Sequence, residues 1–127
     1  MSAAESLTRR AGPYSDVIRE RWRRPHRRGE LPGATGTAED VNPLCGDRVR
    51  MMVRVDDGTV GAVRFVGDSC AICSAAADVA AEMVEGRRLP DGRIDVAEVL
   101  EALQADIRPT RMRCVTLPVD VLIKALG

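Results

Sequence analysis

Aromatic residues are almost absent from this sequence, which contains one Trp, one Tyr and one Phe among its 127 residues. Such a chain offers few rings on which exposed bases could stack, which argues against binding of single-stranded nucleic acid. The core must therefore be aliphatic. The hydrophobic content of 45% is ordinary for a globular protein, and the length is that of one domain able to bury a core without cross-links.

Long hydrophobic runs are also lacking. No stretch is long enough to cross a bilayer, and residues 1–12 lack the apolar segment of a secretory signal. We expect a cytoplasmic protein with a disordered tail at residues 1–12 and a single domain at residues 13–127. Thiols stay reduced in the cytoplasm, so the four cysteines are expected to be metal ligands or reactive groups, or else inert buried side chains.

The formal net charge is zero, but the charges are unevenly distributed. Residues 1–28 contain eight arginines and three acidic residues, so the rest of the chain carries a matching excess of negative charge. A basic N-terminal region can contact nucleic acid or an acidic protein surface, and it can equally be a solvated helix face with a loose tail. The composition alone leaves both interpretations open.

Alternating residues predict a β-hairpin in the middle of the chain. Over residues 48–55, Val49, Met51, Val53 and Val55 alternate with Arg48, Arg50, Met52 and Arg54, which is the pattern of a strand with one buried face. Asp56-Asp57-Gly58 is a hairpin turn, and the returning strand is expected at Thr59–Val66. Residues 29–41 are expected to form a loop or a short edge strand.

Helical spacing of apolar residues predicts helices before and after the hairpin. The first helix is expected to start at Pro13 or Ser15 and to end at Pro25, and the second to be capped by Asp68 or Ser69 and to end at Gly86. A third helix is expected to be capped by Asp95. The last is expected to have Pro118 in its first turn, with Cys114 in the segment before it. Strands grouped between helices predict an α+β fold, with a small antiparallel sheet of about three strands packed against roughly four to five helices.

Three cysteines lie in contexts that favour the thiolate, which is the form that binds metal and attacks sulfur. Cys45 sits in a glycine turn, where backbone N–H groups can point at an anion. Cys70 lies at a helix start, where the helix dipole stabilises negative charge. Cys114 follows Arg111 and Arg113, whose guanidinium groups are expected to stabilise its thiolate.

Asp47 adds a hard oxygen ligand two residues after Cys45. Together Cys45, Asp47, Cys70 and Cys114 make a four-coordinate site for zinc or a labile one for iron. The carboxylate binds less tightly than a thiolate, so it is the ligand most easily released. The separations between the three cysteines match no compact zinc finger, and an aspartate that merely occupies a turn explains Asp47 equally well.

Cys70 and Cys73 form a Cys-x-x-Cys pair whose sulfurs face the same side of a helix. A thioredoxin-like redox site is one interpretation, but it requires a βαβ setting and an antiparallel hairpin precedes Cys70. The other interpretations are that Cys73 packs in the core or that it is an alternative metal ligand competing with Asp47.

Four segments carry a resemblance to a known family. They are the opening helix and turn at Tyr14–Ile18 and Pro25–Gly29, the Asn-Pro-x-Cys-Gly-Asp motif at Asn42–Asp47, the Gly-x-x-Cys-Ala-Ile segment at Gly67–Cys73, and the closing Arg-x-Arg-Cys at Arg111–Cys114. In this order they resemble the U-type iron–sulfur cluster assembly proteins, the NifU N-terminal-like family that includes IscU and SufU. The resemblance covers nearly the whole chain, from Tyr14 to Leu126.

The resemblance implies a SufE/NifU-like α+β fold and a surface site built from Cys45, Asp47, Cys70 and Cys114. In SufU-like members such a site holds zinc and the protein accepts persulfide sulfur from a cysteine desulfurase. In IscU-like members the same positions assemble a transient [2Fe–2S] cluster for downstream assembly or carrier proteins. Cys114 matches the last cysteine of the family, a candidate sulfur acceptor.

Some positions depart from the family pattern. Ser69 stands where the SufU branch has glycine and Cys73 where it has serine, while the spacing from Cys70 to Cys114 is short, as in IscU. We therefore expect a scaffold or a zinc-dependent sulfur acceptor rather than a turnover enzyme, with no nucleic-acid or membrane partner. The alternative is a structural zinc domain that acts as an interaction module through its basic N-terminal region.

Overall fold

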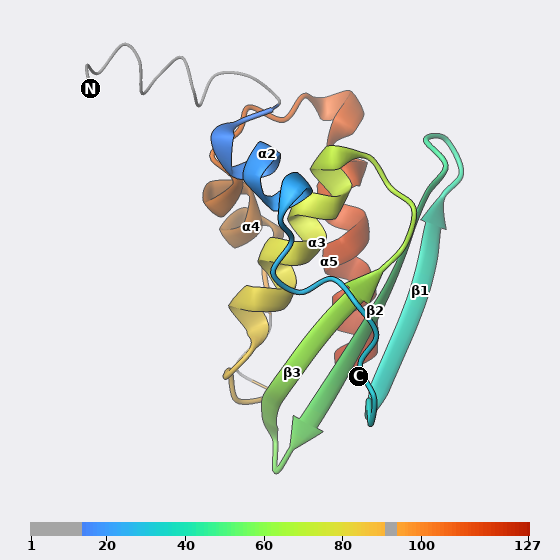
Figure 1. The fold of residues 1–127 in the computed structure, drawn as a ribbon, viewed down its shortest axis with the longest axis vertical. Coiled ribbons are helices and arrows are strands. Elements are labelled where there is room, and N and C mark those ends of the chain that lie inside the picture. Colours follow the sequence, from blue (N-terminus) through green and yellow to red (C-terminus); the bar gives the residue numbers. More distant parts are fainter. Residues whose placement is uncertain (1–13, 91–93) are drawn as a thin grey trace, which may run out of the picture.

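A computed structural model of the protein describes residues 14–90 and 94–127, so the expected tail at residues 1–12 lies outside the described residues. The elements, in chain order, are α2 (Asp16–Arg23), β1 (Gly36–Asn42), β2 (Asp47–Asp56), β3 (Thr59–Val66), α3 (Ala71–Val84), α4 (Val96–Leu103), the 3₁₀ helix η1 (Pro109–Arg111) and α5 (Arg113–Leu126). The strands form an antiparallel sheet in the order β1-β2-β3, and α3 and α5 pack against it (Figure 1). The predicted α+β fold is confirmed.

The predicted hairpin joins β2 to β3 through a tight turn. Asp57 and Gly58 have φ values of 51° and 79°, which is the left-handed pair that a two-residue turn between twisted strands requires. The expected loop or short edge strand before it contains β1, which pairs with β2 from Gly36 opposite Val53 to Asn42 opposite Asp47. The strand is longer than expected because pairing continues up to the turn that carries Cys45.

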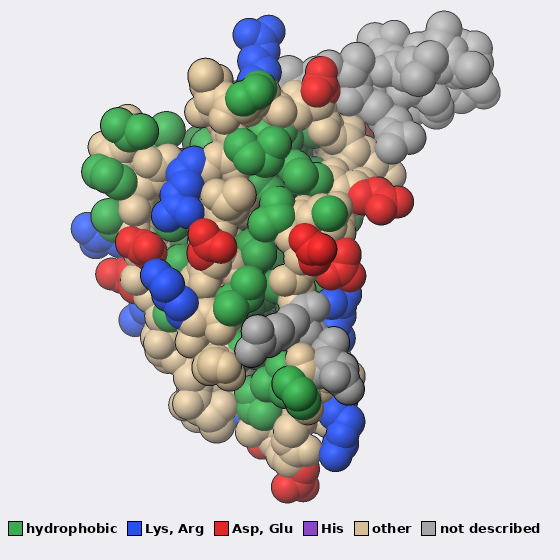
Figure 2. All heavy atoms as spheres, turned by 180° about the vertical axis from the view of Figure 1, so that it is seen from behind, with side chains coloured by type: hydrophobic (Ala, Val, Ile, Leu, Met, Phe, Trp, Pro, Cys, Tyr) green, Lys and Arg blue, Asp and Glu red, His purple; other side chains and the backbone are tan. Residues whose placement is uncertain are grey.

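The core is aliphatic, as the composition requires. Val49, Met51 and Val53 of β2 are almost fully buried, as the alternation predicts. Met52 is buried as well and Val55 only partly, so the alternation does not hold at these two positions. The helix α3 is buried nearly all round because its middle is rich in alanine, and small side chains let it lie close to both the sheet and α5. Apolar side chains that remain at the surface form a band down the rear face, flanked by charged ones (Figure 2).

Helix ends confirm some of the expected caps and correct others. Ser15 caps α2, its Oγ accepting the Ile18 N–H at 3.2 Å, and Asp95 caps α4 in a capping box with Glu98. The cap of α3 is neither Asp68 nor Ser69. Cys70 itself occupies that position, and its sulfur accepts the backbone N–H of Cys73 at 3.4 Å.

The start of the last helix is also different from the prediction. The 3₁₀ turn of η1 runs directly into α5, so the helix begins at Arg113 and Cys114 lies in its first turn. Pro118 lies inside the helix rather than at its start. Because proline has no N–H, it cannot donate to the carbonyl of Cys114, four residues earlier. The first turn that carries Cys114 is therefore less tied to the rest of the helix.

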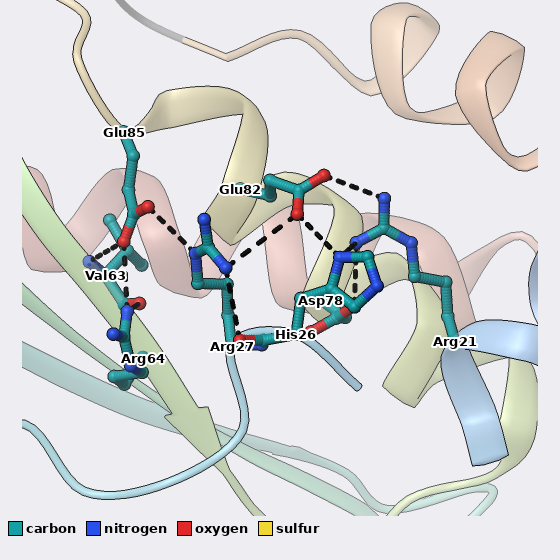
Figure 3. A network of polar contacts seen from close by, with 8 residues as sticks. All are labelled: Arg21, His26, Arg27, Val63, Arg64, Asp78, Glu82 and Glu85. Atoms are coloured by element: carbon teal, nitrogen blue, oxygen red, sulfur yellow. Dashed lines mark hydrogen bonds and ion pairs between the residues drawn. The ribbon is translucent and has the colours of Figure 1, made fainter. Parts of the chain in front are cut away.

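Part of the basic N-terminal region is held against α3 by an ion-pair network (Figure 3). Arg21 contacts the fully buried Asp78 and also Glu82, both at 2.8 Å. The backbone N–H of Arg27 donates to Asp78 at 2.6 Å, and its Nε donates to Glu85 at 2.8 Å. These two arginines therefore fix the fold and are not simply a solvated surface. None of the helices in the described ranges has the length and apolar character needed to span a membrane.

Candidate metal and sulfur site

Three connections meet at one end of the sheet. Antiparallel neighbours run in opposite directions, so the β1–β2 turn at residues 43–46 lies at the same end as the exit from β3 toward α3. The start of α5 lies beside both, since Cys114 contacts Cys70 from one connection and Asp47 from the other. The fold thus gathers residues from distant parts of the sequence.

Asp47 lies at the centre of this arrangement and is only 3% exposed. Its Oδ1 accepts the backbone N–H of Cys70 at 2.9 Å, and its Oδ2 lies 3.7 Å from the sulfur of Cys114. One carboxylate therefore fixes the loop before α3 and faces the first turn of α5. A buried carboxylate with a free edge toward a thiol is a natural oxygen donor to a metal.

The donor atoms of Cys45, Asp47 and Cys114 all lie within 4.8 Å of one another. The sulfur of Cys70 adjoins this group at 3.6 Å from the sulfur of Cys114. Cys45 is exposed, Cys70 is partly exposed and Cys114 is buried, so the group opens to solvent on the side of Cys45. The four residues singled out in the sequence are therefore neighbours in the structure.

Two of the donor separations suit a tetrahedral metal, although Cys70 lies outside the group of three whose ligand atoms are all within 4.8 Å of one another. With zinc–sulfur bonds of about 2.3 Å, the ligands of a tetrahedral zinc lie about 3.7 Å apart. The Cys70–Cys114 and Cys114–Asp47 separations of 3.6 and 3.7 Å match that value. Three soft sulfurs and one carboxylate form a donor set that zinc accepts and that iron also accepts.

Arg111 supplies positive charge beside the sulfurs. Its Nη2 donates to the sulfur of Cys70 at 3.4 Å, and hydrogen bonds to Cys114, Cys70 and Tyr14 raise the pKa of its guanidinium. Burial nevertheless raises the pKa of the Cys114 thiol to about 11, although Arg111 acts to lower it. In the metal-free protein, desolvation therefore outweighs the stabilisation of the Cys114 thiolate that the neighbouring arginines were expected to give.

Two local details differ from the sequence-based expectation. Arg113 forms an ion pair with Asp120 at 3.0 Å on the exposed side of α5, so its charge is engaged away from the sulfurs. In the β1–β2 turn, the backbone N–H groups of Cys45 and Gly46 both donate to the carbonyl of Asn42, at 3.2 and 2.7 Å. These donors hold the turn in shape and do not point at a bound anion.

Cys73 is fully buried in the core cluster. Burial raises the pKa of its thiol most, negative charge on Asp47, Cys70 and Cys114 raises it further, and a hydrogen bond with Ser69 lowers it. Cys73 is therefore a protonated thiol that lies next to the site, on the side of the hydrophobic core. The role of Tyr14 was also missed, because the sequence assigned it only to the opening helix, whereas it bonds Arg111 in the structure. No local sequence pattern marks that contact.

Comparison with known proteins gives several matches. The family model described as NifU-like N terminal domain matches residues 13–127. A bifunctional NifU/MnmA protein of Rubrobacter xylanophilus is 34% identical, covering 88% of this chain but only 23% of the relative's own length. The iron-sulfur cluster assembly scaffold protein IscU of Thermotoga maritima is 30% identical over 89% of this chain and 92% of the relative. The zinc-dependent sulfurtransferase SufU of Bacillus subtilis is 27% identical over 90% and 89%.

A solved structure supports the fold. The crystal structure of a putative iron-sulfur cluster assembly scaffold protein for the SUF system, from Fervidobacterium islandicum, superimposes with a TM-score of 0.74. The match covers 90% of this chain and 96% of the other at 23% sequence identity. The three-stranded sheet with helices on it is therefore shared with that protein.

Proposed function

Because the chain belongs to the NifU-like N terminal domain family, we propose that it is an iron–sulfur cluster assembly protein that accepts persulfide sulfur from a cysteine desulfurase. The observation that supports this most is the convergence of Cys45, Asp47 and Cys114 within 4.8 Å, with Cys70 at 3.6 Å from Cys114. These side chains come from segments that lie far apart in the sequence.

Zinc is the resident metal that the donor set fits, held by Cys45, Asp47, Cys70 and Cys114. When bound, it keeps the sulfurs ionised despite their burial. This resolves the conflict posed by Cys114, whose pKa of about 11 in the metal-free protein leaves it protonated at neutral pH. Arg111 contributes charge on the same side of the sulfurs.

Cys114 is the proposed holder of the transferred sulfur. The thiolate attacks the outer sulfur of the incoming persulfide, a new sulfur–sulfur bond forms, and the desulfurase cysteine leaves as a thiolate. Cys114 is only 1% exposed whereas Cys45 is exposed. The donor therefore approaches from the side of Cys45, which is displaced or serves as the first acceptor.

The same residues suit a scaffold role, in which iron and sulfide are cargo. Cysteine thiolates are the usual ligands of iron–sulfur clusters, and a carboxylate is a ligand that is easily exchanged when the cluster is passed to a carrier protein. Anaerobic incubation with iron and sulfide is expected to give cluster absorption if the protein is a scaffold. Zinc that stays bound, with stimulation of a desulfurase and no cluster, identifies the transfer role instead.

The experiment that tests the proposal is Cys114→Ser. We expect loss of persulfide acceptance, measured by mass mapping after incubation with a desulfurase and cysteine, with an unfolding midpoint close to that of the unmodified protein. A structural zinc domain would behave differently, because loss of one ligand would unfold it. Unfolding of the variant together with no sulfur acceptance by the unmodified protein contradicts the proposal.

A further inference from the structure

Cys73 has no role in the transfer proposed above, yet it shares a helix turn with Cys70. Cys70 is the N-cap of α3 and its sulfur accepts the backbone N–H of Cys73 at 3.4 Å. In this geometry the capping side chain folds back over the third residue of the helix, so the two thiol-bearing side chains start close together. A Cys-x-x-Cys pair at a helix start is an arrangement that forms and breaks disulfides reversibly.

The two thiols differ in access. Cys70 is partly exposed and adjoins Cys114, whereas Cys73 is fully buried and hydrogen-bonded by Ser69. A donor or oxidant from solvent therefore meets Cys70 first. Cys73 can react only with a sulfur that is already inside the protein, and Cys70 is the neighbour whose sulfur contacts its backbone.

We propose that Cys73 is a resolving thiol that releases the transferred sulfur from Cys70 as sulfide, an inference that rests on the proposed function. The Cys70 thiolate attacks the outer sulfur of the Cys114 persulfide, 3.6 Å being the distance between the two cysteine sulfurs. The outer sulfur moves to Cys70, and Cys114 leaves as a thiolate. No electrons are gained or lost overall in this step.

The second step is the reductive one. The Cys73 thiol attacks the inner sulfur of the Cys70 persulfide and passes its proton to the outer sulfur as it does so. A Cys70–Cys73 bond forms, and the outer sulfur leaves with the electron pair of the broken bond. The Cys73 proton leaves with it as hydrogen sulfide. The dithiol is oxidised by two electrons and the sulfane sulfur is reduced by two, so no further reductant enters. A small dithiol then returns the disulfide to thiols.

This step supplies what cluster assembly needs. The sulfur of a persulfide is at the oxidation level of elemental sulfur, whereas cluster sulfur is sulfide. A chain that carries its own dithiol beside the acceptor makes that change with its own two electrons, and the small dithiol is needed only afterwards to restore the thiols. It also confines the released sulfide to the site where iron would be bound.

The test loads the reduced protein, with its metal content as purified, with sulfane sulfur from inorganic polysulfide, which requires no desulfurase, and removes the excess before measurement. We expect the unmodified protein to release sulfide without added reductant and to yield a Cys70–Cys73 disulfide on peptide mapping. Cys73→Ser should retain the persulfide and release sulfide at least roughly tenfold more slowly. Ser74→Ala removes a hydrogen bond to Ser69 at 2.8 Å but leaves both thiols in place; it controls for disturbance of the helix start and should release sulfide as the unmodified protein does.

Three results overturn the inference. They are a Cys70–Cys114 disulfide in place of Cys70–Cys73, equal sulfide release by Cys73→Ser, and no sulfane sulfur on Cys70 or Cys114 of Cys73→Ser after polysulfide treatment. Peptide mapping of the unmodified protein decides the matter even if Cys73→Ser folds poorly. A parallel sample with desulfurase and cysteine separates the two proposals. If sulfur reaches the protein from polysulfide but not from the desulfurase, the proposed function is contradicted and the dithiol step is not.

Discussion

The carboxylate of Asp47 is bonded to the backbone of Cys70, with its Oδ1 accepting that N–H at 2.9 Å. The second oxygen faces the sulfur of Cys114 at 3.7 Å. The residue therefore braces the site before any metal is bound and leaves one oxygen available as a ligand. A site held in place by its own hydrogen bonds loses little conformational freedom when it binds metal.

Asp47→Asn separates these two roles. The amide oxygen still accepts the Cys70 N–H, so we expect the fold to remain, but a neutral amide is a poor zinc ligand. Zinc affinity measured by competition with a chelator should fall by at least about tenfold. Asp68→Asn, which removes an exposed charge nearby, should change the affinity little. Equal affinity of Asp47→Asn and the unmodified protein would exclude Asp47 as a ligand.

Asp78→Ala tests the network that holds the N-terminal segment to α3. Asp78 is fully buried and bonds both Arg21 and the backbone of Arg27, so its loss leaves a partly buried guanidinium and an N–H without this acceptor. We expect the free energy of unfolding to fall by about 3 kcal/mol in urea titration. Glu20→Ala breaks only the exposed pair with Arg24 and should change it by less than about 0.5 kcal/mol. Similar losses in both variants would contradict the structural role.

Glu82 gives the protein a defined acid sensitivity. The hydrogen bonds from Arg21 and His26 lower the pKa of Glu82 from 4.5 to about 2. A carboxylate whose pKa is lower in the folded state stabilises the fold above its ordinary pKa and loses that contribution as the pH falls toward the folded value. We expect the unmodified protein to lose more stability than Glu82→Gln between about pH 5 and pH 2. Urea midpoints of both proteins across this range measure the difference. Equal losses of stability in the two proteins would refute the expectation.

Gly67 controls the loop that carries Cys70. Its φ is 154°, and a Cβ at this position would lie 2.0 Å from the backbone oxygen of Arg48. Gly67→Ala must therefore push the loop off β2, and we expect a loss of at least about 2 kcal/mol in stability together with weaker zinc binding. At Gly61 the nearest atom to an added Cβ is the flexible end of Asp56. Gly61→Ala should be milder by both measurements, and the reverse order would contradict this explanation.

Local chemistry made the hairpin and several caps predictable from the sequence. The turn at Asp57 and Gly58 and the caps at Ser15 and Asp95 depend on residues within a few positions of each other. The predicted start of α5 was wrong. Pro118 indicated a helix that begins close to it, but the preceding 3₁₀ turn runs directly into α5 and Pro118 lies inside the helix. The consequence is large, since it places Cys114 in a buried first turn and raises the pKa of its thiol.

The four residues of the candidate site were proposed from the chemistry around each cysteine and from motif resemblance, and their spacing did not predict that they would lie together. Contacts that join distant segments, such as Tyr14 with Arg111, depend on how the helices are rotated against each other and leave no local pattern. Arg113 shows the same limit, because two arginines flanking Met112 look equivalent in the sequence. In the structure Arg111 ends η1 and reaches the sulfurs, whereas Arg113 begins α5 and faces Asp120.

The most direct test of the account combines two measurements on protein purified anaerobically. Metal analysis is expected to find about one zinc per chain, and incubation with a cysteine desulfurase and cysteine is expected to place sulfane sulfur on Cys114. Both should be lost or strongly reduced in Cys114→Ser while the variant stays folded. A protein that carries neither metal nor transferred sulfur, or in which Cys114→Ser changes neither, would contradict the central claim.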